Sequence, residues 1–111
     1  MEGFVKGDVI ILEFPFSDLK SFKRRPALII KVPKGEDVII CQITAKSQEQ
    51  SVETPISKND FIDGGLSRDS FIRIDKITII KKTRIKYKAG SLKQIKVNEI
   101  VDSVCSFLKT N

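Results

Sequence analysis

The sequence contains no histidine, and this absence excludes several kinds of catalytic site. Ser-His-Asp and Cys-His nucleophilic sites need an imidazole as general base, as does the paired-histidine chemistry of many ribonucleases. Two cysteines without histidine do not make a zinc site, and no cluster of carboxylates that would bind a harder cation stands out. We therefore expect no metal and no cofactor. Any catalysis must depend on carboxylates, hydroxyls and guanidinium groups.

Long apolar runs are also missing, since none approaches the roughly 20 residues needed to cross a bilayer. The first residues, Met1 to Phe4, lack the basic segment and apolar stretch of a secretory signal. Only two cysteines occur, Cys41 and Cys105, and both lie inside apolar patterns. These observations predict a cytoplasmic protein that does not contact a membrane and keeps two reduced thiols in its core.

Acidic residues are absent from one segment, residues 81–96, which holds seven lysines and arginines. The net charge of +6 therefore arises in one part of the chain, because basic and acidic residues nearly balance elsewhere. A patch of one sign attracts nucleic acid or an acidic protein, or it is a solvated lysine face that maintains solubility. The sequence leaves these alternatives open. A length of 111 residues predicts one domain spanning residues 1–111.

What the chain does contain is a series of short apolar runs bounded by glycine, proline and polar residues. These runs predict strands over residues 9–14, 27–32, 37–44, 52–56 and 70–77, with β character continuing to residue 87. Pro26 is expected at the start of its strand, after a polar loop that ends at Lys23, and Pro55 indicates an edge strand.

A helix is predicted near the end of the sequence. Apolar residues recur there with helical spacing, at Val97, Ile100, Val101, Val104, Phe107 and Leu108, and Asn98 is a candidate N-cap. Five to seven short, closely spaced strands followed by one helix predict a mainly β protein with a small barrel. A barrel of this size has no room for an internal ligand, so its function is expected on loops or at an interface.

Arg25 and Thr44 are the first candidate site residues. The strands 27–32 and 37–44 form a probable hairpin around Pro33–Gly35, so the residue that opens one strand lies near the residue that closes the other. If directly opposed, their Cβ atoms would be about 5 Å apart. A guanidinium beside a hydroxyl would bind a phosphate group. The alternatives are an ordinary surface arginine and an ordinary strand end.

Arg73 and Asp75 are the second pair, because they occupy positions i and i+2 of a strand and share one face. Arginine does not readily act as a base, and its expected role is to stabilise negative charge on a phosphorane-like transition state. Asp75 could accept the proton of a ribose 2′-OH. The pair could equally be a structural ion pair.

The ordered set of motifs resembles the MazF/PemK family of toxin endoribonucleases from bacterial toxin–antitoxin modules. The residues that match, in order along the whole chain, are Gly7-Asp8-Val9, Phe14-Pro15-Phe16-Ser17, Arg24-Arg25-Pro26-Ala27-Leu28, Gln42-Ile43-Thr44, Gly65-Leu66, Ser70, Arg73, Asp75-Lys76 and Ala89-Gly90-Ser91-Leu92.

The resemblance implies an SH3-like barrel with a C-terminal helix, assembled as a homodimer. It implies metal-independent cleavage of single-stranded RNA by attack of the 2′-OH, leaving a 2′,3′-cyclic phosphate and a 5′-OH end. An acidic antitoxin protein would cover the RNA groove. The catalytic residues of the family map onto Arg25 and Thr44 and, in some relatives, onto Arg73 and Asp75. Contacts to RNA are expected from Ser17, Asp18, Lys23, Arg24, Gln42 and Ser70.

The sequence departs from the family pattern in the loop before Arg25, where many members have a glutamate. This chain has only Asp18 there, and Lys20 is nearer the expected position. This departure motivates an alternative, a non-catalytic basic barrel that binds nucleic acid or a protein partner. Toxins of related fold that poison gyrase depend on a tryptophan near the C-terminus, and this chain has no tryptophan.

Overall fold

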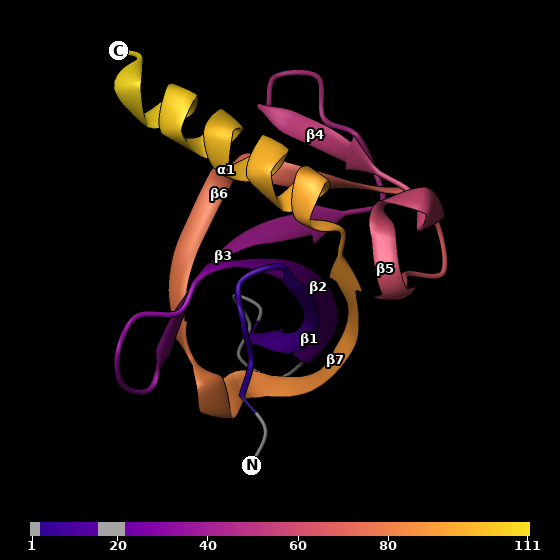
Figure 1. Cartoon of the computed structure of the whole chain (residues 1–111), viewed down its shortest axis with the longest axis vertical. Coiled ribbons are helices and arrows are strands. Elements are labelled where there is room, and N and C mark those ends of the chain that lie inside the picture. Colours follow the sequence, from indigo (N-terminus) through magenta and orange to yellow (C-terminus); the bar gives the residue numbers. More distant parts are fainter. Residues whose placement is uncertain (1–2, 16–21) are drawn as a thin grey trace.

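The computed structural model describes residues 3–15 and 22–111. Over these residues the chain forms one antiparallel sheet and one α-helix (Figure 1). The elements are β1 (Asp8–Pro15), β2 (Phe22–Lys31), β3 (Asp37–Thr44), β4 (Glu53–Ile56), the 3-10 turn η1 (Lys58–Asp60), β5 (Phe61–Gly64), β6 (Ser70–Lys81), the 3-10 turn η2 (Lys82–Arg84), β7 (Ile85–Leu92) and α1 (Gln94–Lys109).

The described strands form a seven-stranded sheet in the order β4-β6-β3-β2-β1-β7-β5. Figure 1 shows that the sheet curls strongly, so that β1, β2, β3, β6 and β7 surround a common interior. The prediction of a mainly β, SH3-like small barrel with a C-terminal helix is confirmed. β4 lies at an edge of the sheet, as Pro55 indicated, because a residue without an N–H is tolerated where the ladder ends.

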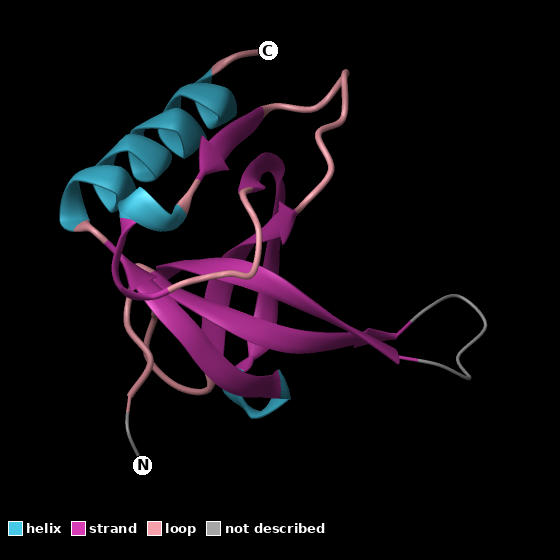
Figure 2. Ribbon diagram, turned by 90° about the vertical axis from the view of Figure 1, so that its right-hand side faces the viewer, coloured by secondary structure: helices cyan, strands magenta, loops and turns pink. Residues whose placement is uncertain are grey.

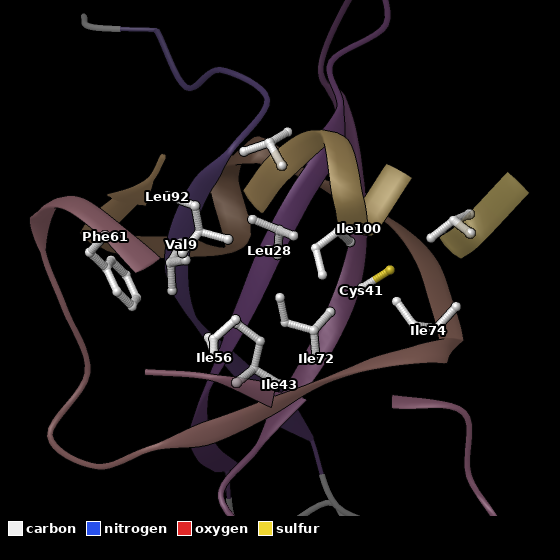
Figure 3. Close-up of a cluster of buried hydrophobic side chains, with 12 residues drawn as sticks. Val9, Leu28, Cys41, Ile43, Ile56, Phe61, Ile72, Ile74, Leu92 and Ile100 are labelled. Carbon is white, nitrogen blue, oxygen red and sulfur yellow. The ribbon is translucent and has the colours of Figure 1, made fainter. Parts of the chain in front are cut away.

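The core consists of two clusters on opposite faces of the sheet, since successive side chains of a strand point in opposite directions. One cluster lies between the sheet and α1 and includes Val9, Leu28, Ile72 and Ile100 (Figure 3). The second lies on the other face and consists of Ile10, Leu12, Ala27, Ile29, Val38 and Ile40. Because the central strands are buried on both faces, their sequences are continuous apolar runs rather than alternating patterns.

The helix differs from its prediction at both ends. It begins at Gln94, so Asn98 is not its N-cap but lies in the second turn, where its Oδ1 accepts a hydrogen bond of 2.9 Å from Gln94 Nε2. Leu108 is 66% exposed, because the last turn of α1 extends past the strands beneath it (Figure 1). Cys105 is exposed on the same helix, so the prediction of two core thiols is correct only for Cys41.

β2 begins before Pro26, contrary to the prediction that a loop continues to Lys23. Its first residues pair with β1 alone, from Ile11↔Pro26 to Pro15↔Phe22, and pairing with β3 starts at Ala27↔Gln42. Pro26 lacks an N–H, which is consistent with the ladder to β3 ending beside it. β1 and β2 therefore extend beyond the rest of the sheet as a two-stranded hairpin (Figure 2). The predicted contact residues Ser17 and Asp18 lie outside the described residues.

Candidate functional site: a cationic cavity at one end of the barrel

A bulge in β6 determines where the later pair of candidate residues lies. Cys41 of β3 is opposite Ile77, whereas Ile43 is opposite Ile72, so β6 advances by five residues while β3 advances by two. Within this bulge the N–H of Ile74 donates a 2.8 Å hydrogen bond to the carbonyl of Val52, just before β4. Bulges redirect side chains, and they are frequent beside active sites. Here the bulge directs Arg73 toward the end of β3.

A cavity of about 210 Å³ lies at this end of the sheet. The side chains around it are mostly polar: Arg25, Gln42, Thr44, Gln48 and Arg73, together with Pro26 and Ile43. The β2–β3 register, Ala27↔Gln42, places Arg25 across from Thr44 when it is continued by two residues. The structure thus brings together both candidate arginines, Thr44 and Gln42, while their chemical roles stay predictions.

Arg73 is 9% exposed, which is unusual for a charged side chain. Its Nε lies 3.5 Å from Asp75 Oδ1, but neither atom has a hydrogen-bond partner among the described residues. A buried guanidinium with an unsatisfied N–H is costly unless an anion or water completes it. Arg73 therefore places a largely buried positive charge at the edge of a cavity that is large enough for a phosphate group.

Asp75 is placed behind Arg73 and is not among the residues that line the cavity. Its Oδ2 accepts a 3.4 Å hydrogen bond from the N–H of Val52. The nearby Asp75 charge also acts on Cys41, where burial first and Asp75 second raise the pKa of the thiol to about 12. These contacts favour the structural alternative for Asp75, a partner that orients Arg73.

Thr44 ends β3, and its hydroxyl holds the turn that follows. Thr44 Oγ1 accepts a 3.2 Å hydrogen bond from the N–H of Lys46. The Thr44 hydroxyl also donates a 3.3 Å hydrogen bond to the carbonyl oxygen of Lys46. This turn motif is typical of serine and threonine at the ends of regular elements. It positions the hydroxyl at the edge of the cavity.

Glu53 is a contributor to this region that sequence reasoning missed. It is the register partner of Arg73 in the β4–β6 ladder. Its carboxylate accepts hydrogen bonds from the Ser47 hydroxyl, from the Ser51 hydroxyl at 2.7 Å and from the N–H of Gln48 at 3.3 Å. These serine hydrogen bonds, with a smaller effect of Arg73, lower the pKa of Glu53. No sequence motif could have identified Glu53, because its hydrogen bonds to the preceding loop are visible only in the folded structure.

Of the other predicted contact residues, Arg24 and Ser70 lie near this end of the sheet. Lys23 and Arg24 belong to β2, and Arg24 Nε lies 3.8 Å from Glu13 Oε2. Ser70 begins β6 and is buried, with its hydroxyl donating a 3.1 Å hydrogen bond to the carbonyl of Arg68. Arg24 and Ser70 both line a second cavity, which also includes Arg25 and Pro26.

The basic segment 81–96 does not form one uncompensated patch, and this corrects the sequence interpretation. Its residues are spread over the end of β6, η2, β7 and the start of α1. Four of its lysines lie within 4.0 Å of a carboxylate oxygen: Lys81 beside Asp37, Lys86 beside Glu13, Lys88 beside Asp8 and Lys96 beside both Asp60 and Glu99. For Lys81, Lys86 and Lys88, antiparallel neighbours bring acidic residues from distant parts of the chain beside this segment. Lys96 lies in the first turn of α1, where Glu99 is three residues away on the same helix.

A larger, shallower groove of about 780 Å³ runs along α1, away from the cationic cavity. Its charged lining residues are Glu99 and Asp102, and it includes no lysine or arginine. An anionic ligand would be repelled there, so this groove is not the candidate site. In the described part of the chain, no three acidic, cysteine or histidine side chains gather into a metal-binding group. Over the same residues, no helix has both the length and the apolar character needed to cross a membrane.

A curled antiparallel sheet with one C-terminal helix and a cationic cavity at the β2–β3–β6 end defines the class of the protein. Residues 5–108 match the model of the family described as "PemK-like, MazF-like toxin of type II toxin-antitoxin system". The chain belongs to this family, which confirms the resemblance noted in the sequence. No match is found among curated proteins.

Solved structures show the same fold at low sequence identity. An endoribonuclease in complex with its cognate antitoxin from Mycobacterial species is 16% identical, with a TM-score of 0.71 over 100% of this chain and 98% of that one. The Mycobacterium tuberculosis toxin MazF-mt6 is 17% identical, with a TM-score of 0.67 over 92% and 98%. The MazE-MazF structure from Deinococcus radiodurans is 14% identical, with a TM-score of 0.66 over 96% and 97%.

Proposed function

We propose that this toxin-family protein is an endoribonuclease that cleaves single-stranded RNA without a metal ion. The observation that supports this most strongly is the cavity that joins Arg25, Arg73 and Thr44, because two guanidiniums and a hydroxyl border the same space. The similar structures described as endoribonucleases, and one with its cognate antitoxin, support the same reading.

The two guanidiniums and the hydroxyl would surround the scissile phosphodiester. In this scheme the ribose 2′-OH loses its proton to solvent water and its oxygen bonds to phosphorus. The bond from phosphorus to the 5′-oxygen breaks, and that oxygen takes a proton from water, giving a 2′,3′-cyclic phosphate and a 5′-OH end. Negative charge grows on the phosphate oxygens as the transition state forms. Arginines that already point at that position stabilise this charge without reorganisation. The Thr44 hydroxyl would turn its one O–H from the Lys46 carbonyl, 3.3 Å away, to a phosphate oxygen. Asp75 would orient Arg73 rather than accept a proton.

The remaining parts of the proposal concern assembly and partners. A net charge of +6 suits both RNA and an acidic antitoxin protein. Two copies of the chain would form a longer groove than one small barrel offers. The toxin would act on RNA in the cytoplasm.

The direct test incubates purified protein with single-stranded RNA in EDTA and analyses the ends of the products. We expect cyclic phosphate and 5′-OH ends from the wild type. Arg25→Ala and Thr44→Ala should lower the cleavage rate by about 10²-fold or more, as removal of a transition-state donor does. Arg84→Ala is the matched control, because Arg84 lies outside the cavity and makes a 3.5 Å contact to the Glu13 carbonyl.

Asp75→Asn separates the two roles of that residue in the same assay. A positioning role predicts a lower kcat with an unchanged shape of the pH–rate profile, whereas loss of a general base would remove the acidic limb of the profile. RNA left intact by the wild type, or cut equally by Arg25→Ala, would contradict the proposal. RNA binding without any products would instead favour the non-catalytic barrel.

A further inference from the structure

A second cavity of about 280 Å³ adjoins the first, and the two share Arg25 and Pro26. The lining differs from that of the first cavity, because much of it is apolar: Ile11, Pro26, Ala45 and Leu66. Ile11 and Pro26 are register partners in the β1–β2 ladder, so they form a continuous surface across two strands. Around this surface lie Arg24, Arg25 and Arg68 with the hydroxyl residues Ser67 and Ser70.

An apolar floor beside guanidiniums suits a nucleotide better than an isolated phosphate. Unpaired bases stack on flat apolar or guanidinium surfaces, and their edges then meet hydrogen-bonding side chains. Because Arg25 and Pro26 belong to both cavities, a ligand in the second lies directly beside a phosphate in the first. Two cavities that share lining residues would hold consecutive nucleotides of one strand, with the phosphate at Arg25 and the neighbouring base over Ile11 and Pro26.

Arg68 is the side chain best placed to distinguish one base from another. Arg25 is shared with the phosphate cavity, and Arg24 lies near Glu13, 3.8 Å from its carboxylate. Arg68 is exposed, and the hydrogen bond from the buried Ser70 hydroxyl to its carbonyl holds its backbone beside the cavity. The next residue, Asp69, lines a different cavity and is not part of the lining of this one.

We propose that the second cavity binds the nucleotide next to the scissile phosphodiester and that Arg68 selects guanine at that position. Guanine is the base whose O6 and N7 accept the two parallel hydrogen bonds of a guanidinium. This inference rests on the proposed ribonuclease function, and it names a specificity residue of that same site.

The experiment cleaves a random-sequence single-stranded RNA pool and sequences the new ends. The wild type should enrich guanine at one position flanking the cut. Arg68→Ala should lower this enrichment by about 5- to 150-fold, corresponding to the discrimination of one bidentate contact, and should leave preferences at other positions unchanged. Arg68→Lys should lose most of the enrichment, because an ammonium lacks the planar fork. Arg84→Ala should keep the wild-type pattern.

The outcomes separate this inference from the proposed function. If the wild type cuts RNA and Arg68→Ala has the same end sequences, the inference is overturned and the ribonuclease assignment stands. If the wild type cuts nothing, the assignment fails. The nucleotide-binding site is then tested by measuring the binding of RNA with a 2′-deoxy nucleotide at the cut site, because such RNA resists cleavage. Loss of guanine discrimination in Arg68→Ala supports the site, whereas discrimination equal to that of the wild type overturns it. An unchanged melting temperature of Arg68→Ala verifies that the variant is folded.

Discussion

Arg73 occupies a position where its own charge is hard to accommodate. It is 9% exposed, its register partner is Glu53, and Asp75 lies 3.5 Å from its Nε. Two carboxylates near one guanidinium hold the charge in place without satisfying the Nε hydrogen. Such an arrangement is poor for stability alone, because a buried ion pair seldom repays its desolvation. We interpret it as preparation for an anionic ligand.

Glu53 provides the prediction at the residue scale. Its pKa is lowered in the folded state, so its stabilising hydrogen bonds are present above the pKa of the unfolded chain and are lost as the pH falls through the folded-state pKa. Glu53→Gln should therefore lower the melting temperature by a few degrees at pH 7. The difference from the wild type should shrink as the pH falls through the lowered pKa of Glu53, below which both side chains are neutral.

Thermal unfolding across this pH range measures the effect. Glu49→Gln is the control, because Glu49 is exposed on the same loop and is not among the acceptors of the Ser47 and Ser51 hydroxyls. A difference between wild type and Glu53→Gln that stays constant as the pH falls through the lowered pKa would contradict the prediction.

At the scale of elements, backbone irregularities position the site. The bulge in β6 directs Arg73 toward the end of β3, and the β2–β3 ladder ends where Pro26 lacks an N–H. Both irregularities lie at the same end of the barrel. A regular sheet would place the paired strands evenly and leave no cavity between Arg25, Thr44 and Arg73.

The β5–β7 pair at the other edge of the sheet depends on close backbone approach. A Cβ at Gly90 would lie 2.6 Å from the Asp63 carbonyl oxygen and 2.7 Å from the Gly65 nitrogen, and neither atom belongs to a flexible side chain. Gly90→Ala should therefore destabilise the fold by about 1–3 kcal/mol, the usual cost of overpacking. Urea unfolding measures this free energy.

Gly3→Ala is the matched control for that substitution, since no heavy atom lies within 4 Å of a Cβ at Gly3. The cleavage rate of folded Gly90→Ala should equal that of the wild type, because Gly90 is absent from the lining of both site cavities. Equal stability of Gly90→Ala and Gly3→Ala would show that the β5–β7 pair relaxes instead.

At the scale of the whole molecule, charge is distributed unevenly between the two ends of β3. Asp37 at one end is paired with Lys81, whose Nζ lies 3.9 Å from a carboxylate oxygen. Thr44 at the other end borders the cavity with Arg25 and Arg73. The two ends are about 23 Å apart, from about 3.3 Å per residue. This distance exceeds two Debye lengths in physiological salt, so each end acts independently on a bound polyanion.

RNA affinity should reflect this division through its dependence on salt. Each phosphate contact on a single strand contributes a slope of about −0.7 in log K against log salt concentration. Arg25→Ala should make the slope shallower by about 0.7, whereas Lys81→Ala should leave it unchanged. Fluorescence anisotropy with a 2′-deoxy-blocked RNA over a range of salt concentrations measures both slopes. A larger effect of Lys81→Ala would place the RNA on the opposite end of the barrel.

Much of the fold was predictable because its signals are local. Apolar runs between glycine and proline indicate strands, and the spacing of Val97, Ile100 and Val104 indicates the helix that covers the sheet. The neighbourhood of Arg25 and Thr44 was also predictable, since a tight hairpin determines which residues lie opposite each other. Errors arose at Asn98 and Leu108, where the ends of α1 depend on packing against the rest of the molecule.

The sequence by itself determined the mainly β class and the types of residue available for chemistry, because composition and local periodicity depend on near neighbours alone. The order of its motifs along the chain carried the resemblance to the family. Only the tertiary structure decided that four lysines of residues 81–96 lie beside carboxylates and that a bulge turns Arg73 toward Thr44. It also decided that Glu53 is the register partner of Arg73 and that Arg68 lines the second cavity. These relations join residues far apart in the chain. They follow from sheet register and closure, which no local pattern encodes.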